Sequence, residues 1–207
     1  LGVIPFGSGN GLARFLGIPM DTAKSIGTIN GERVGTIDSA ILNGQRFFNA
    51  AGMGFDAHIG EVFSHDKNRG FWAYIKSSFN EISSYNAENY HINIDGTEYV
   101  RDAFMLSIAN SSQFGNNAHV SPRASVQDGL LDICIIKQFP LWRFIEMGIR
   151  MFAKTADKSK YVEIIRGKNV NIRRSTDGPV HLDGEPQMMG KEVDIQIMPA
   201  SLRIITG

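Results

Sequence analysis

Short runs rich in isoleucine, valine and aromatic residues recur along the chain, and turn residues separate them. Runs of this length and composition are typical of strands in an antiparallel sandwich or barrel. Asn-Gly or Asp-Gly at 30–31, 43–44 and 95–96 favours the positive φ angles of type I′ hairpin turns. The expected strands are 39–42, 45–49, 90–94, 97–100, 104–109, 130–137, 161–166, 170–173, 193–198 and 202–206.

Helical patterns are confined to fewer segments, in which apolar residues recur every three or four positions or a capping residue opens a short helix. Asp21 is a candidate N-cap of this kind. The expected helices are 9–16, 21–26, 56–64, 71–82 and 141–152. The whole pattern predicts a mainly β fold, an antiparallel β-sandwich with inserted helices, preceded by a segment of strand–loop–helix character.

Composition narrows the function classes. The 207-residue chain carries 21 Lys and Arg against 21 Asp and Glu, and this zero net charge excludes a dedicated nucleic-acid-binding protein, which needs a basic excess. The single cysteine, Cys134, excludes a disulfide framework, and no stretch is apolar for the ~18 residues of a membrane-spanning helix. Because Leu1 opens a run that already has the pattern of a buried strand, we expect a piece of a longer protein.

The first segment with candidate chemistry is the glycine-rich stretch Gly7, Ser8, Gly9 and Asn10, between a predicted strand and a predicted helix. Backbone N–H groups at such a turn can hold a phosphate. The stretch is not a P-loop, because no Gly-Lys-Ser/Thr follows, and Leu12 stands where a dinucleotide-binding fingerprint has its third glycine. A strand-to-helix turn without a ligand accounts for the same residues.

Two later turns carry carboxylates. Asp128 and the turn around it offer a side-chain oxygen and backbone carbonyls, the ligands that Mg²⁺ or Ca²⁺ prefers, although an ordinary hairpin turn explains the same pattern. Asp183 and Glu185 flank Gly184, which lets the backbone approach a ligand closely. A carboxylate there could accept a proton from a substrate hydroxyl, and a plain surface turn is the alternative.

A membrane-facing surface is a further hypothesis. Aromatic residues of the two longer predicted helices, such as Trp142, could face lipid or pack in a core. Residues 150–174 hold eight Lys and Arg against Asp157 and Glu163, an excess that could meet anionic headgroups or nucleotide phosphates. A solvated basic face is the default interpretation of this excess.

Several motifs occur in a fixed order. They are Pro-Phe-Gly-Ser-Gly-Asn and Leu-Ala-Arg (5–14), Phe-Asn-Ala-Ala-Gly-Met-Gly-Phe-Asp (48–56), Ala-Asn (109–110), Ala-His-Val-Ser-Pro-Arg-Ala with Asp-Gly-Leu-Leu-Asp (118–132) and Leu-Asp-Gly-Glu (182–185). In this order they resemble the diacylglycerol kinase catalytic-domain family, the bacterial lipid kinases related to sphingosine kinases and more distantly to NAD kinases. Two departures stand out: Gly11 takes the place of the family's Asp, and the family's upstream Gly-Gly-Asp-Gly-Thr loop is not in these residues.

The resemblance implies the C-terminal portion of a two-domain α/β + β lipid-kinase fold. Residues 1–35 would be a remnant of the nucleotide-binding domain, 36–190 the β-sandwich, and 191–207 closing strands that return toward the first domain. Gly7, Ser8, Gly9 and Asn10 would line the ATP phosphates. Mg²⁺ would be held by the Asp128 carboxylate with the carbonyls of Ser125 and Leu130. Glu185, with Asp183 beside it, would face the cleft as the catalytic carboxylate.

The implied activity is transfer of the γ-phosphoryl group of ATP to a lipid hydroxyl, of diacylglycerol or a similar lipid, with Mg²⁺. Such a protein would be cytoplasmic and peripheral to the membrane that holds its substrate. It would bind no nucleic acid, and it could form a homodimer. A kinase of a soluble nucleotide and a non-catalytic lipid- or partner-binding domain are the alternatives. The chain itself, without the upstream loop, is expected to be inactive.

Overall fold

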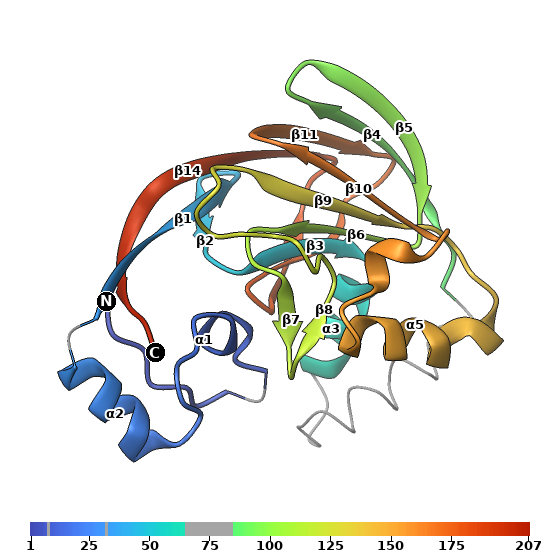
Figure 1. Cartoon of the computed structure of the whole chain (residues 1–207). Coiled ribbons are helices and arrows are strands. Elements are labelled where there is room, and N and C mark those ends of the chain that lie inside the picture. The colour runs from blue at the N-terminus through green and yellow to red at the C-terminus, as the bar shows by residue number, and fades with distance from the viewer. Residues whose placement is uncertain (8, 32, 65–84) are drawn as a thin grey trace.

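The computed structural model describes residues 1–7, 9–31, 33–64 and 85–207, and two six-stranded antiparallel sheets dominate it (Figure 1). The first sheet has the order β2 (Gln45–Phe47), β1 (Val34–Leu42), β14 (Glu192–Ile205), β11 (Asn169–Arg174), β4 (Glu88–Ile94) and β5 (Thr97–Ala103). The second has the order β10 (Val162–Gly167), β9 (Leu131–Ile136), β6 (Met105–Ala109), β3 (Ala50–Gly54), β12 (Gly178–Leu182) and β13 (Glu185–Met189). A small third sheet pairs β7 (Gln113–Gly115) with β8 (Ala118–His119).

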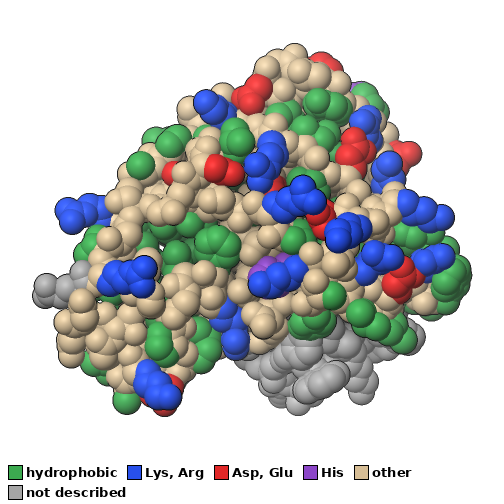
Figure 2. Space-filling view, in the orientation of Figure 1, with side chains coloured by type: hydrophobic (Ala, Val, Ile, Leu, Met, Phe, Trp, Pro, Cys, Tyr) green, Lys and Arg blue, Asp and Glu red, His purple; other side chains and the backbone are tan. Residues whose placement is uncertain are grey.

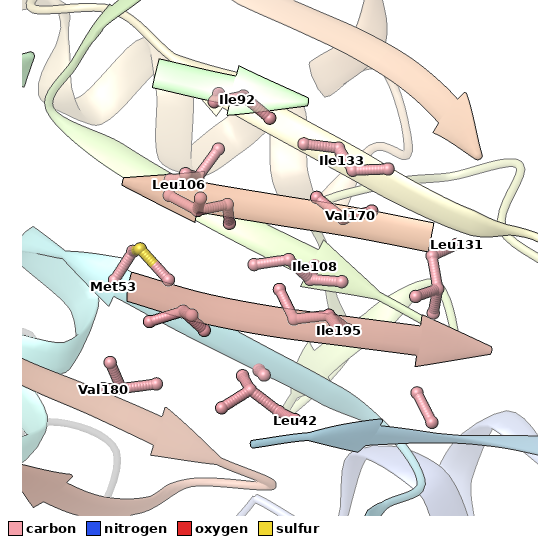
Figure 3. Packing of buried hydrophobic residues seen from close by; sticks show 14 of the residues in the cluster. Leu42, Met53, Ile92, Leu106, Ile108, Leu131, Ile133, Val170, Val180 and Ile195 are labelled. Carbon is pink, nitrogen blue, oxygen red and sulfur yellow. The ribbon is translucent and has the colours of Figure 1, made fainter. Parts of the chain in front are cut away.

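The two large sheets share one hydrophobic core. In β14 the buried residues Val193, Ile195 and Ile197 alternate with the exposed residues Asp194 and Gln196, as a strand with one solvated face requires. Figure 3 shows core side chains from both sheets: Leu42, Ile92, Val170 and Ile195 from the first, and Met53, Leu106, Ile108, Leu131, Ile133 and Val180 from the second. The predicted sandwich is confirmed.

The second sheet is covered on both faces. Strands β3, β6 and β9 are buried at every position, so their sequences do not alternate. A second cluster on the outer face contains Phe55 of α3 (Phe55–Ser64) and Phe104, and Met151 of α5 (Phe144–Phe152) packs against it. This helical cover lies at the lower right of Figure 1.

Two of the three predicted hairpin turns are confirmed. Asn43 and Gly44 have φ angles of 45° and 83°, and Asp95 and Gly96 have 50° and 89°, which is the type I′ pattern. The prediction at Asn30-Gly31 is wrong, because Asn30 ends the helix α2 (Thr22–Asn30) and Gly31 caps it with a φ of −74°.

The two strands predicted at 193–198 and 202–206 are one continuous strand. β14 pairs with β1 from Leu42↔Ile195 to Val34↔Ile205, with one irregularity in register between Ile37 and Ser39. Opposite Asp38 the ladder is interrupted by a bulge, in which Ala200 has a φ of 49° and its N–H donates to the Asp38 carboxylate at 2.7 Å. Beyond the sandwich, the N–H of Ile205 donates to the Leu1 carbonyl at 2.9 Å, so β14 reaches the N-terminal segment. The division into 1–35, 36–190 and 191–207 stays a prediction.

The described helices agree with most of the predicted ones. They are α1 (Gly11–Phe15), α2, α3, η1 (Leu141–Arg143), α5 and the short η2 (Ala156–Lys158). The Asp21 side chain accepts a hydrogen bond from the Lys24 N–H at 2.9 Å, which confirms the N-cap of α2. The helix predicted at 71–82 lies outside the described residues. Among the helices that are described, none is both long and apolar enough to cross a membrane.

Candidate functional site

The glycine-rich loop folds back on itself before α1. The Asn10 amide donates to the Gly7 carbonyl at 2.6 Å and its oxygen accepts from the Gly7 N–H at 3.1 Å, which holds Asn10 at a φ of 50°. The Gly9 carbonyl accepts from the Asn116 N–H at 3.0 Å. Ser8 lies outside the described residues. The loop is therefore a closed turn fastened to the segment that follows β7.

Gly11 occupies a position with little room for a side chain. An added Cβ would lie 2.9 Å from the Asn49 amide nitrogen and 3.0 Å from the Gln113 carbonyl oxygen. Those two groups are themselves hydrogen-bonded at 2.9 Å. An Asp at position 11 would have to displace this contact, so the absence of the family's carboxylate matches the local packing.

The turn between β12 and β13 is tied to the same residue, Asn49. The Asp183 carboxylate accepts three successive backbone N–H groups, at 2.9 Å (Phe48), 2.7 Å (Asn49) and 3.1 Å (Ala50). The Asp183 N–H also donates to the Ala50 carbonyl at 2.8 Å. Asn49 thus links the glycine-rich loop to the carboxylate turn, although 170 or more positions separate them in the sequence.

The two predicted catalytic carboxylates differ in their surroundings. Crowding by protein atoms raises the pKa of Asp183, against the effect of its three N–H donors, which lower it. The residue as a whole is exposed in the turn, and its carboxylate oxygens are held by the three N–H donors. Glu185 is the exposed first residue of β13, and no hydrogen bond or ion pair to its carboxylate exists within the described part of the chain. The Asp183 carboxylate is therefore hydrogen-bonded to the backbone, whereas the Glu185 carboxylate has no partner among the described residues and could contact a substrate.

A buried carboxylate–imidazole pair joins Asp56 of α3 to His181 of β12. His181 Nε2 is 2.9 Å from the Asp56 carboxylate, and the two side chains are 8% and 7% exposed. A Cβ added at Gly52 would lie 2.5 Å from His181 Nε2, so glycine is needed beside the pair. His181 Nδ1 is buried without a hydrogen-bond partner among the described residues. Asp56 and His181 are 125 positions apart, and nothing in the sequence signalled their contact.

The side chains of the predicted magnesium site have partners within the protein. Asp128 accepts from the Leu130 N–H at 3.1 Å and lies 3.6 Å from the Arg166 guanidinium. Ser125 Oγ accepts from a backbone N–H two residues later, at 3.3 Å. Within the described ranges there is no group of three or more His, Cys, Asp or Glu that could hold a metal. A cation would have to compete with a guanidinium for one carboxylate, and the site stays a prediction.

A neighbouring carboxylate, Asp38, was missed. It is buried in β1 and accepts from the Gly129 N–H at 2.8 Å and the Ala200 N–H at 2.7 Å. Asp38 therefore fixes the turn after Asp128 against β14 through backbone contacts. A lone Asp inside a strand was the available signal, and its partners lie about 90 and 160 residues away.

A groove lies elsewhere, on the first sheet. It is lined by polar residues of the two type I′ turns and of β11 and β14, such as Asn43, Asp95 and Asp194. None of the predicted site residues lines it. The candidate site is therefore identified by its hydrogen bonds and not by a cavity.

Similar proteins carry lipid-kinase names. The chain is 27% identical over 206 residues to "Probable lipid kinase YegS-like" of Pseudomonas aeruginosa PAO1, covering 99% of the chain and 67% of that protein. It is 28% identical over 188 residues to "Diacylglycerol kinase" of Bacillus subtilis (strain 168), covering 89% of the chain and 62% of that protein. The chain thus spans roughly two thirds of the length of these relatives.

The fold agrees with solved structures of similarly named proteins. A diacylglycerol kinase from Bacillus anthracis str. Sterne superposes with a TM-score of 0.72 at 22% identity, over 99% of the chain and 65% of that structure. The chain accordingly has the fold of the β portion of such a kinase. Residues 49–206 match the family model of the YegS C-terminal NAD kinase beta sandwich-like domain, and the chain belongs to that family.

Proposed function

We propose that the protein containing this chain is an ATP-dependent lipid kinase, which transfers the γ-phosphoryl group to the hydroxyl of diacylglycerol or a similar lipid. The names of two relatives, a probable lipid kinase and a diacylglycerol kinase, support this substrate class. The observation that carries the proposal is the β12–β13 turn. Its Asp183 accepts hydrogen bonds from three backbone N–H groups, whereas Glu185, two residues later, is exposed and has no hydrogen bond or ion pair within the described residues.

Glu185 would act on the lipid hydroxyl. As an oxygen–phosphorus bond forms between the hydroxyl oxygen and the γ-phosphorus, the hydroxyl proton passes to the Glu185 carboxylate and ADP departs as leaving group. Asp183 would be a positioning residue, because its hydrogen bonds attach the turn to the backbone at Asn49 and so fix the position of Glu185, the first residue of β13. Phosphoryl transfer depends mainly on such positioning and on charge stabilisation.

The nucleotide and the membrane complete the proposal. Gly7, Ser8, Gly9 and Asn10 would line the ATP phosphates, whose charge Mg²⁺ neutralises in phosphoryl transfer. A lipid substrate lies in a bilayer, so the protein would work in the cytoplasm as a peripheral membrane protein. We derive no step through a metal at Ser125, Asp128 and Leu130, whose binding of Mg²⁺ stays a prediction.

The test is steady-state kinetics of the full-length protein on lipid in mixed micelles. Glu185→Gln keeps the size of the side chain and removes the proton acceptor, so kcat should fall by about 10²–10⁴-fold. The KM for ATP should change little, because the carboxylate acts on the other substrate. Gln187→Glu, two positions along β13, is the control for a change of one charge on this strand. A Glu185→Gln enzyme with nearly full kcat would refute the assignment.

Two other functions are outcomes of the same experiment. Turnover of a soluble nucleotide that does not depend on lipid would indicate a nucleotide kinase. No turnover of ATP by the full-length protein, together with lipid binding, would indicate a non-catalytic domain; the missing carboxylate at Gly11 is the observation that favours this second candidate.

A further inference from the structure

The helical cover of the second sheet presents an apolar row to solvent. Leu141 and Trp142 of η1 are 43% and 71% exposed, and Ile145 and Ile149 of α5 are 68% and 62% exposed. Positions 142, 145 and 149 are spaced by three and four residues, so they lie on one side of the helix. Of the twelve large exposed hydrophobic residues in the described part of the chain, these four fall within nine positions.

The opposite side of the same helix holds it in place. Met147 is buried, and Met151 packs against the cluster that covers the second sheet. The Arg150 guanidinium pairs with Glu146 at 2.9 Å, one turn apart on the helix. The apolar row is therefore carried by an anchored helix, and its exposure does not come from a loose chain end.

Positive charge borders the row. After α5 come Lys154, Lys158 and Lys160, all exposed, and none has a carboxylate within ion-pair distance among the described residues. Lys160 Nζ lies 5.2 Å above the Tyr161 ring, and the Arg143 guanidinium lies 4.3 Å above the Trp142 ring. Figure 2 shows hydrophobic side chains at the position of α5, with Lys and Arg side chains next to them.

We propose that η1 and α5, with these three lysines, form a docking surface for an anionic lipid bilayer. Tryptophan and aliphatic residues on one side of a helix, bordered by lysines, are the composition of a helix that lies in a membrane interface. The choice of a bilayer over a protein partner rests on charge complementarity, because lysines left unpaired by the protein's own carboxylates match anionic headgroups. The proposal rests on the proposed function in that a lipid substrate requires a membrane surface.

The surface makes two separable contributions to binding. The apolar row would be buried in the headgroup region whatever the lipid charge. Each unpaired lysine near an anionic surface would strengthen binding by roughly fivefold at low salt, and added salt would weaken this part by screening. Binding should therefore need both the row and the charge.

Flotation of the full-length protein with large unilamellar vesicles tests this. We use phosphatidylcholine with and without phosphatidylglycerol. Trp142→Ser/Ile149→Ser should weaken binding to the anionic vesicles by roughly tenfold or more. Lys158→Gln/Lys160→Gln should weaken it by roughly 25-fold at low salt, roughly fivefold for each lysine, and only where phosphatidylglycerol is present. The matched control is Val100→Ser/Met188→Ser, at residues that are 51% and 63% exposed away from α5, and it should bind like the wild type. Melting temperatures establish that each variant is folded.

Three results would overturn the proposal. The first is that the Trp142→Ser/Ile149→Ser variant binds vesicles as tightly as the wild type. The second is that the wild type binds neutral and anionic vesicles equally. The third is that the wild type is a dimer in sedimentation velocity and this variant a monomer, which would assign the face to a second copy of the chain. Glu185→Gln keeps this surface, so its normal vesicle binding with lost turnover separates docking from catalysis. On a water-soluble short-chain diacylglycerol the docking variants should retain the turnover of the wild type. If neither the wild type nor the variants phosphorylate lipid, but the apolar row still controls vesicle binding, only the kinase proposal fails.

Discussion

Asp183 should be essential for stability and not only for its place beside Glu185. Its carboxylate holds three backbone N–H groups of the strand entry at Phe48–Ala50, and its φ of 51° lies in the left-handed region. Asp and Asn tolerate this conformation, whereas Ala pays about 1 kcal/mol for it. The stabilisation by the hydrogen bonds and the energy of the left-handed backbone are therefore separable by substitution.

The magnitudes follow from the exposure of the turn. Because Asp183 is exposed, water can replace part of the lost hydrogen bonds, and the contacts should contribute about 1–2 kcal/mol, as for a side chain that caps a helix. Asp183→Ala loses both contributions and should cost about 2–3 kcal/mol. Asp183→Asn keeps the left-handed conformation and one acceptor oxygen, and should cost about 1 kcal/mol.

Thermal unfolding followed by circular dichroism measures the difference. At about 2–4 °C per kcal/mol for a chain of this size, Asp183→Ala should lower the melting temperature by about 4–12 °C. Glu185→Gln is the control, because Glu185 has no partner in the described part of the chain, and this variant should stay within about 0.5 kcal/mol of the wild type. If Asp183→Ala melts with the wild type, the three hydrogen bonds contribute nothing and the division of roles between the two carboxylates is wrong.

Three further predictions concern other parts of the fold. Gly52→Ala would force a methyl group against the Asp56–His181 pair and should lower the free energy of unfolding by about 1–3 kcal/mol, measured by urea denaturation. Glu163 has a pKa lowered chiefly by its hydrogen bonds to a neighbouring arginine, so its stabilisation is present above the ordinary glutamate pKa of about 4.3 and is lost as the pH falls through the lower folded value. Glu163→Gln should therefore lower the free energy of unfolding by about 0.5 kcal/mol at neutral pH and should have no effect below the folded pKa of Glu163. An effect that is the same at every pH would contradict the ion pair. If Mg²⁺ binds at Asp128, it should raise the melting temperature and Asp128→Asn should abolish the increase, whereas equal melting with and without Mg²⁺ would leave an ordinary turn.

The sequence by itself determined the hairpins and the class of fold. Asn43-Gly44 and Asp95-Gly96 fix their turns locally, because only residues that accept positive φ at both positions can form them. Alternation in β4 and β14 likewise marks strands with one buried face. The ordered motifs were enough to indicate the lipid-kinase family, which the match over residues 49–206 confirms.

Tertiary structure decided the elements whose sequences lack strand character. β3 is Ala-Ala-Gly-Met-Gly, and it is a strand because β6 and β12 pair with it on both sides and its small residues let α3 approach. β14 continues through Pro199 because β1 pairs with it on either side of that position. In such places long-range hydrogen bonding outweighs local propensity.

The roles of the site residues were also a tertiary matter. Local spacing found Asp183 and Glu185 together. Only the fold shows that Asp183 accepts hydrogen bonds from a distant backbone segment and that Glu185 has no partner among the described residues. The contacts of Asp56 with His181 and of Gly11 with Asn49 join residues far apart in the chain, and no periodicity encodes such pairs. The sequence supplies the chemical groups, and the packing of the sheets determines which of them hold the structure and which remain available to a substrate.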